Sequence, residues 1–460
     1  MAIHMKNEKS IVAVVAAISS FLTPFMSTAL NLALPSIGTE FSADTILLSW
    51  LVTSFLLASS ALLLPFGRIA DIIGRKRILL NGLLIFGLSS LMGIFSGSIN
   101  HLILLRILQG IGSAMIFGTA IAILTSVYPL NERGKALGIN IATVYIGLSL
   151  GPFLGGILTH YFGWRSIFLF SGITGIITYL IAKRFVLNEW CDAKGETFDY
   201  FGSITYIISL VFLVYGFITF TSGGSIFILA SLLFGSIFIH REHKTENPIL
   251  NIKLLTNNLA FSMSNLAALL NYGATYAVAF LISFYLQSLR GFSAQDAGLI
   301  LLAQPLVQAI FSPITGKLSD KVEPRTLASL GMGITCIGLV LFSFIKLDTS
   351  IYQIILNLVL LGFGFALFSS PNTNAIMSSV ERKFAGVASA MLATVRILGQ
   401  MTSMAIITVL IAFYVGNNPI SAEFSPLFLQ GITASFKVSA ILCLFGIFAS
   451  LARKNIRNQN

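Results

Sequence analysis

The sequence predicts an all-α integral membrane protein with fourteen transmembrane helices. Hydrophobic residues make up 56% and charged residues 10% of its 460 positions, whereas soluble domains contain roughly 45–50% and about 25%. Apolar runs of about 20 residues, the length that spans a bilayer, recur along the whole chain. A short charged turn also occurs twice, which indicates that the chain consists of two related halves.

The predicted helices form three groups. The first six cover residues 11–34, 46–66, 78–97, 102–128, 136–158 and 165–184, and two more cover 200–220 and 224–240. The last six cover 259–287, 294–315, 326–346, 352–377, 384–414 and 431–452. We therefore expect a six-helix bundle in residues 1–185, two inserted helices with flanking linkers in 186–255, and a second six-helix bundle in 256–460.

The repeat that divides the chain is centred on the turn Gly67–Arg77, which has a counterpart at Gly316–Lys321. Corresponding residues lie 249 positions apart: Gly67 and Gly316, Asp71 and Asp320, Glu132 and Glu381, Arg133 and Arg382. A looser similarity relates Gly110–Gly112 to Gly362–Gly364. Helices 1–6 therefore correspond to helices 9–14. Two such repeats are typical of transporters whose substrate site lies between them.

The distribution of Lys and Arg predicts the orientation. If the N-terminus is cytoplasmic, 22 of the 28 Lys and Arg residues lie in inside segments and three in outside loops. Because cytoplasmic loops carry the excess of Lys and Arg, we expect both termini in the cytoplasm. The net charge of +11 is thereby attributed to membrane orientation and not to nucleic acid. Only Arg106, Arg396 and Lys437 fall inside predicted helices.

Several ordered motifs resemble those of the major facilitator superfamily, in particular its fourteen-helix drug/proton antiporter branch. Gly67–Arg77 is similar to the family's loop between helices 2 and 3, and Leu105–Gly112 to its helix 4 signature with one buried Arg. Gly147–Gly156 resembles the helix 5 motif of antiporters. Weaker similarities are found at Asn31–Pro35, Ser370–Asn374 and Arg396–Gln400.

The resemblance implies roles for three sets of residues. A gate near the cytoplasm would use Gly67, Asp71, Gly74, Arg75, Arg133, Gly316, Asp320 and Arg382. The antiporter motif of helix 5 would comprise Gly147, Gly151, Pro152, Gly155 and Gly156, which are expected on one face. Coupling or cavity residues would be Asn31, Arg106, Gln109, Tyr145, Asn271, Tyr272, Gln304, Gln308, Asn372, Asn374, Arg396 and Gln400.

Each assignment has a simpler alternative. The cations of the turn can serve only to orient the protein, and the glycines can serve only close helix packing. Arg106 can satisfy backbone carbonyls instead of facing a cavity, and some of the membrane-embedded amides can join helices instead of binding substrate.

The sequence departs from the branch at helix 1, where Met26 replaces the usual Asp. A buried carboxylate is the usual proton carrier in such pumps because desolvation raises its pKa toward neutrality. All seventeen Asp and Glu residues fall in loops or at helix ends, and none in a predicted helix core. With Arg106 and Arg396 in the membrane, we expect neutral or anionic amphiphiles to be handled at least as well as cations.

The predicted function is export of amphiphilic small molecules by alternating access at the plasma membrane, with protons as the coupling ion implied by resemblance. We expect membrane lipids as the surroundings, a monomer, and no cofactor, metal or enzymatic activity. The three cysteines lack a metal-site spacing, and no phosphate-binding loop of the ATPase type occurs. Two alternatives remain: a facilitator or symporter of a metabolite, and a non-transporting membrane sensor.

Overall fold

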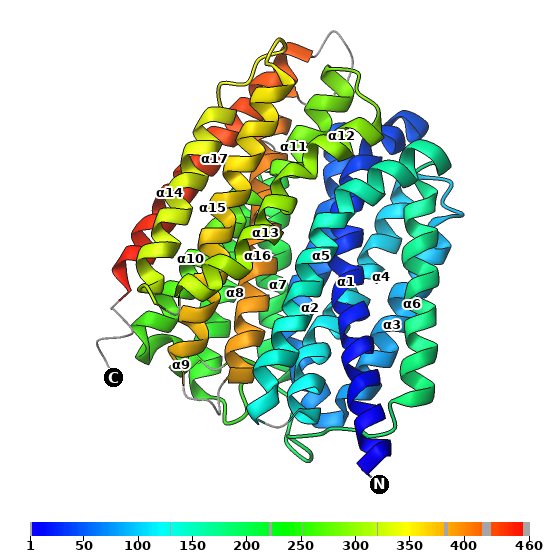
Figure 1. The fold of residues 1–460 in the computed structure, drawn as a ribbon, viewed down its shortest axis with the longest axis vertical. Coiled ribbons are helices and arrows are strands. Elements are labelled where there is room, and N and C mark those ends of the chain that lie inside the picture. The colour runs from blue at the N-terminus through cyan, green and yellow to red at the C-terminus, as the bar shows by residue number, and fades with distance from the viewer. Residues whose placement is uncertain are drawn as a thin grey trace.

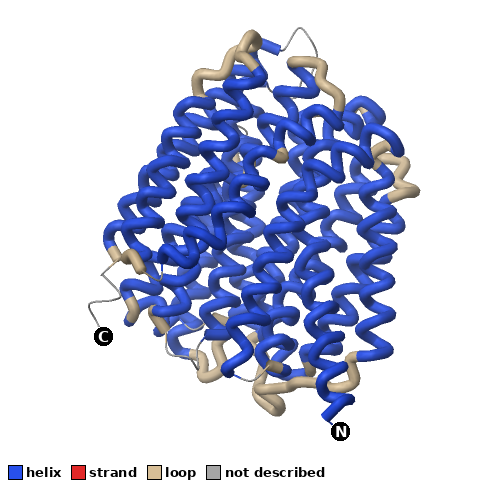
Figure 2. The backbone as a smooth tube through the Cα atoms, in the orientation of Figure 1, coloured by secondary structure: helices blue, strands red, loops and turns tan. Residues whose placement is uncertain are grey.

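A computed structural model describes residues 2–128, 130–219, 223–250, 252–319, 321–380, 385–415 and 425–453. Within these ranges the secondary structure is helical, with loops between the helices and no strand (Figure 2). Among the described residues, fourteen helices are long and apolar enough to cross a membrane. The predicted number of spans is therefore confirmed.

The first half consists of α1 to α6. Their bounds are α1 (Ala2–Phe41), α2 (Thr45–Ile73), α3 (Arg75–Gly93), α4 (Ile99–Val127), α5 (Leu130–Phe162) and α6 (Arg165–Phe185). Two helices follow, α7 (Tyr200–Ile218) and α8 (Ser225–Lys244), and a short helix, α9 (Ile252–Asn257), precedes the second half.

The second half contains two interrupted spans. The first consists of α10 (Leu259–Thr275), α11 (Val278–Phe284) and the π-helix η2 (Tyr285–Leu289), and the second of α12 (Ala294–Leu301) and α13 (Ala303–Ser319). Four continuous helices complete the bundle: α14 (Pro324–Phe342), α15 (Ile351–Ser378), α16 (Ala385–Val415) and α17 (Ser425–Ala452).

The charged turn is shorter than the sequence predicts. Helix α2 runs to Ile73 and α3 starts at Arg75, so that Gly74 alone separates them. Hydropathy marks only the apolar part of a helix, whereas here the ion pair between Asp71 and Arg75, four residues apart, bridges the break. The start of α1, this turn and the end of α17 lie at the same end of the molecule (Figure 1). We call it the basic end and the opposite one the far end.

Corresponding glycines pack in the same way in the two halves. A Cβ at Gly112 of α4 would lie 2.7 Å from the carbonyl oxygen of Gly82 in α3. A Cβ at Gly364 of α15 would lie 2.9 Å from that of Gly331 in α14. Gly110 likewise contacts α2, and Gly362 contacts α13. This agreement supports the pairing of helices 1–6 with helices 9–14, while the two boundaries between the three predicted domains stay a prediction.

The two halves meet along α1, α2 and α5 on one side and α11, α12 and α16 on the other (Figure 1). Helix α7 packs against both α2 and α16, where the Tyr206 hydroxyl donates to the carbonyl oxygen of Ser60 (3.1 Å). Helix α8 pairs with α7 through Ser209 and Ser231. The inserted helices thus flank the junction between the halves.

Candidate functional site

A small cavity of about 30 Å³ lies between the halves, near the middle of the helices; we call it the central pocket. Four helices of the first half and α16 of the second contribute to its wall. The lining residues are Thr23, Pro24, Ser27, Phe55, Leu56, Ser59, Ser113, Phe117, Val144, Leu148, Arg396, Ile397 and Gln400. A lining of apolar side chains with a few polar groups is typical of small-molecule sites. In this conformation the space itself admits only about one water molecule.

Two predicted cavity residues line this pocket, Arg396 and Gln400, one turn apart on α16. The Arg396 guanidinium lies 5.6 Å from the centre of the Phe117 ring, which reaches the same pocket from α4. Such an arrangement is a cation–π contact. The prediction that Arg396 faces a cavity therefore agrees with its position.

Arg106 lies behind the pocket wall. Its Nε donates to the carbonyl oxygen of Leu51 (2.9 Å) and its Nη1 to Oε1 of Gln109 (2.9 Å). Gln109 in turn donates to Ser90 (2.8 Å), so that the predicted cavity residue Gln109 is also held inside the first half. The guanidinium lies 4.2 Å from the centre of the Phe55 ring. Arg106 thus satisfies a backbone carbonyl, the alternative that the sequence left open.

Hydroxyl groups join the halves next to the pocket. The predicted cavity residue Tyr145 of α5 shares a hydrogen bond with Ser369 of α15. Ser27 of α1 shares one with Tyr276, between α10 and α11. Toward the far end, Ser283 donates to the backbone oxygen of Asn31 (2.9 Å). Sequence reasoning missed these serines, because serine is common in membrane helices and the sequence does not show which neighbouring helix its side chain faces.

Most other predicted cavity residues do not line the described pocket. Asn31 and Asn271 are buried, and their side-chain amides have no hydrogen-bond partner among the described residues. Tyr272 packs on Phe365 (5.5 Å between ring centres). Gln304 is half-buried, and Gln308 is buried with an unpartnered Nε2. In this structure they lie outside the lining of the central pocket. Their expected coupling or cavity role stays a prediction.

Asn372 and Asn374 serve the second half itself. Asn374 donates to Ser319 (2.9 Å). Asn372 donates to the backbone oxygen of Ser264 (3.1 Å) and accepts from Arg453 (2.9 Å). Arg453, one of the cations assigned to the inside segments, is fully buried directly after the last helix.

Arg453 joins three helices at the basic end. Besides Asn372 in α15, it donates to the Ser264 hydroxyl in α10 (3.0 Å) and to the carbonyl oxygen of Pro324 in α14 (2.8 Å). Burial lowers the pKa of Arg453 to about 10, so the group stays charged at neutral pH. Sequence reasoning missed this burial, because an Arg next to the end of a membrane helix normally faces water.

The charged turn is organised by Arg75, which is buried. It donates to Asp71 (2.8 Å) and to the Ser126 hydroxyl at the end of α4 (2.6 Å), and it pairs with Asp192 (2.6 Å). The expected gate role of Arg133 stays a prediction, because its side chain lies outside the described residues.

The linker between α6 and α7 covers this turn, a contact that sequence reasoning missed. Glu189 accepts from the backbone amides of Lys76 (2.7 Å) and Arg77 (3.1 Å), the first turn of α3. Gly74 has a φ of 127°, and a Cβ there would lie 2.5 Å from the Glu189 carboxyl carbon. Arg68 pairs with Glu196 of the same linker. The sequence did offer a signal for this contact, since the linker carries three acids (Glu189, Asp192 and Glu196) and the turn a row of cations (Arg75–Arg77).

The corresponding turn of the second half is only partly described. Gly316 has Ser370 of α15 as the nearest neighbour of a Cβ, at 3.7 Å. Asp320 and Arg382 lie outside the described residues. In the first half, Gly67 and Gly118 approach each other closely. A Cβ added at Gly118 would lie 3.2 Å from the backbone nitrogen of Gly67.

The glycines of α5 face two neighbours, which corrects the expectation of one face. Gly147, Gly151 and Gly155 pack against α1; a Cβ at Gly155 would lie 2.7 Å from the Cα of Ala29. Gly156 is one residue further round the helix and contacts α12. A Cβ at Gly156 would lie 2.6 Å from the carbonyl oxygen of Ala294, and one at Gly298 would lie 2.6 Å from that of Pro152. The motif therefore joins α5 to both halves.

Two carboxylates are buried at the basic end of α7 and α8. Asp199 accepts from the Gly202 amide (3.0 Å), and Glu242 accepts from the Leu250 amide (2.7 Å). A Cβ at Gly202 would lie 2.7 Å from Asp199 Oδ2 and 2.9 Å from Glu242 Oε1. The sequence analysis expected both acids in loops or at helix ends. They lie at helix ends, and no described residue lining the central pocket carries a carboxyl group.

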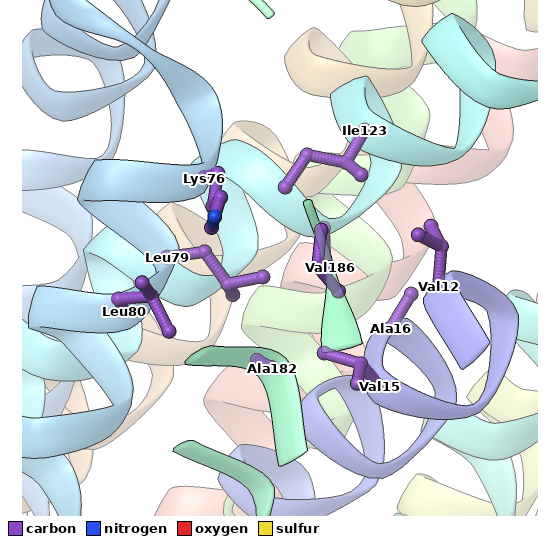
Figure 3. A pocket seen from close by; sticks show the side chains of 10 residues that line it. Val12, Val15, Ala16, Lys76, Leu79, Leu80, Ile123, Ala182 and Val186 are labelled. Atoms are coloured by element: carbon purple, nitrogen blue, oxygen red, sulfur yellow. The ribbon is translucent and has the colours of Figure 1, made fainter. Parts of the chain in front are cut away.

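A second hollow, shown in Figure 3, lies within the first half between α1, α3, α4 and α6. Its lining is apolar except for Lys76, which donates from Nζ to the backbone oxygen of Leu187 (3.4 Å). Because no helix of the second half reaches it, this hollow is a packing gap and not the interface pocket.

Comparison with known proteins places the chain in a family. A model of the Major Facilitator Superfamily matches residues 16–239 and 265–459. This chain belongs to the Major Facilitator Superfamily. Its relatives in the superfamily include the riboflavin transporter RibZ of Clostridioides difficile, which is 30% identical over 97% of each chain.

Other members of the superfamily have names that refer to drugs. Multidrug resistance protein Stp of Mycobacterium tuberculosis is 29% identical over 82% of this chain and 71% of its own. Multidrug resistance protein 3 of Bacillus subtilis is 29% identical over 78% and 71%. The fold matches the crystal structure of a bacterial homologue of the human lysosomal transporter Spinster, with a TM-score of 0.70, 17% identity and 97% coverage of both chains. The expected fold and family are confirmed.

Proposed function

We propose that this superfamily member is a secondary active exporter of amphiphilic small molecules, coupled to protons and working by alternating access. The observation that carries the proposal is the pocket between α1, α2, α4 and α5 of one half and α16 of the other. A substrate held there contacts both halves, so that rocking of one half against the other can expose it to either side.

The packing of α5 supports movement of this kind. Gly156 and Gly298 bring the halves into backbone contact toward the far end, while the charged turn and its linker lie at the basic end. We place the gate residues Asp71 and Arg75 at the cytoplasmic surface of a monomer that lies in the plasma membrane with both termini in the cytoplasm. Relatives named multidrug resistance proteins favour export.

A facilitator or symporter of a metabolite is the second candidate. It is favoured by the relative named riboflavin transporter, which matches 97% of this chain. The two candidates differ in what a proton gradient does to transport, because only the antiporter exchanges protons for substrate.

The test is transport by the purified protein in proteoliposomes with an imposed pH gradient, using fluorescent cationic, anionic and neutral amphiphiles. We expect substrate movement against its gradient, with proton movement in the opposite direction. Equilibration that responds to neither the pH gradient nor the membrane potential would contradict the exporter and identify the facilitator.

A further inference from the structure

We infer that the central pocket selects amphiphilic organic anions that combine an aromatic ring with a carboxylate or a similar acidic group. This inference rests on the proposed function, since it names the substrate class of the same pocket. Unlike a general multidrug site, the pocket would prefer one sign of substrate charge, and Arg396 would be the residue that determines this preference.

The first step is the charge of the wall. Arg396 is the only ionisable side chain among the described residues that line the pocket, and none of them is acidic. No carboxylate of the described residues forms an ion pair with it; its aromatic contact is with the Phe117 ring. A cation at membrane depth is costly unless it is paired. A substrate anion would supply the missing partner.

The second step is the charge behind the wall. Arg106 does not line the pocket, but its guanidinium stacks on Phe55, and Phe55 does line it. The hydrogen bonds of Arg106 go to a backbone carbonyl and an amide, neither of which carries a negative charge. These partners therefore do not neutralise its positive charge, and only the Phe55 ring separates this charge from the pocket. Two such charges raise the electrostatic potential of the pocket and disfavour a cationic substrate.

The third step is the shape of the partner. Phe55 and Phe117 contribute aromatic rings to the lining. Ser27, Ser59 and Ser113 contribute hydroxyl groups, which are hydrogen-bonded to Tyr276 or to each other. Guanidinium groups bind carboxylates through two parallel hydrogen bonds, which gives geometric specificity as well as energy. Gln400, next to Arg396 in the wall, adds an amide donor and acceptor. The lining groups thus complement a ring with one acidic substituent, for which the cavity would widen as the halves move apart.

The experiment compares three probes built on one fluorescent ring: an aryl carboxylate, its methyl ester and a quaternary ammonium analogue. Transport into proteoliposomes gives kcat/KM, and quenching of the probe by purified protein gives Kd. We expect the carboxylate to exceed the ammonium analogue by at least about 10-fold in both measurements, the factor that one charge-assisted hydrogen bond supplies.

The variant Arg396→Gln should lower kcat/KM and affinity for the carboxylate by about 10- to 100-fold while leaving the ester nearly unchanged. Arg396→Lys keeps the charge but not the paired donors, so an intermediate loss is expected. Lys437→Gln is the matched control, because Lys437 is an exposed cation on α17 outside the pocket. It should change neither probe.

Preference for the ammonium analogue, or equal losses for carboxylate and ester in Arg396→Gln, would overturn the inference. If no probe is transported, binding decides: a carboxylate preference that Arg396→Gln abolishes supports the anion site while the transport proposal fails. If all probes are transported without a preference for charge, the transport proposal stands and the anion site is refuted. If Arg396→Gln does not fold, Arg396→Lys and the wild-type probe series give the same decision.

Discussion

Ser27 and Tyr276 share a hydrogen bond across the junction of the two halves, and they are 249 positions apart, the offset that separates the two charged turns. Ser27 in the first half and Tyr276 in the second half therefore occupy equivalent positions of the repeat. Equivalent positions can touch only close to the axis that relates the halves. The contact thus marks that axis beside the central pocket, which Ser27 also lines.

The first prediction concerns this contact. Tyr276→Phe and Ser27→Ala each remove one hydrogen bond and should each lower the free energy of unfolding by about 0.5–1.5 kcal/mol. Because both delete the same bond, the double variant should lose less than the sum of the two. Thermal unfolding in detergent measures this cycle. Tyr352→Phe, at a tyrosine that is 84% exposed, is the control; strict additivity would refute the contact.

The second prediction tests the backbone approach of the halves. Gly298→Ala places a Cβ 2.6 Å from the carbonyl oxygen of Pro152. Since backbone must shift to admit it, we expect a loss of about 1–3 kcal/mol in stability and slower transport.

The control for that substitution is Gly333→Ala. Gly333 is a helical glycine of α14, and a Cβ added there would have no neighbouring atom within 4 Å. An alanine at this position should be neutral or stabilise by up to about 1 kcal/mol. Equal behaviour of the two variants in thermal unfolding would mean that α5 and α12 are not in close contact.

The third prediction concerns Arg453. Replacement by Met leaves the carbonyl oxygen of Pro324 and the side chain of Asn372 without their charged donor. We expect a loss of about 2–5 kcal/mol, as is usual when one member of a buried polar network is removed. Lys437→Met removes an exposed cation and should change the melting temperature little. A stable Arg453→Met protein would show that α17 is held by its apolar face alone.

The fourth prediction addresses the linker. Glu189 accepts the amides of Lys76 and Arg77 and thereby caps α3. Glu189→Ala should cost about 0.5–2 kcal/mol, the usual effect of losing a helix N-cap. Hydrogen exchange at the first turn of α3 should accelerate, whereas Glu246→Ala, at an exposed acid beyond α8, should not affect it. Unchanged protection of Lys76 and Arg77 would count against the cap.

The number of spans, the repeat and the family follow from the amino-acid sequence alone. Hydropathy over about 20 consecutive residues, loop charges and motif spacing are properties of contiguous segments, so no tertiary contact is needed to recognise them. The repeat at Gly67 and Gly316 even anticipated which helices would pack alike, as the pairs Gly112–Gly82 and Gly364–Gly331 demonstrate.

Which polar residues meet the pocket is settled by the packing of the helices and not by local sequence. Arg106 and Arg396 are each a single cation in an apolar helix, yet one is enclosed behind Phe55 and the other lines the wall. Asn372 and Gln400 are likewise both amide side chains in apolar helices of the second half. Asn372 is hydrogen-bonded to Arg453 within that half, whereas Gln400 lines the central pocket. The physical reason is that the facing of a side chain depends on how its helix is rotated against segments far away in the chain, and hydropathy averages over every face.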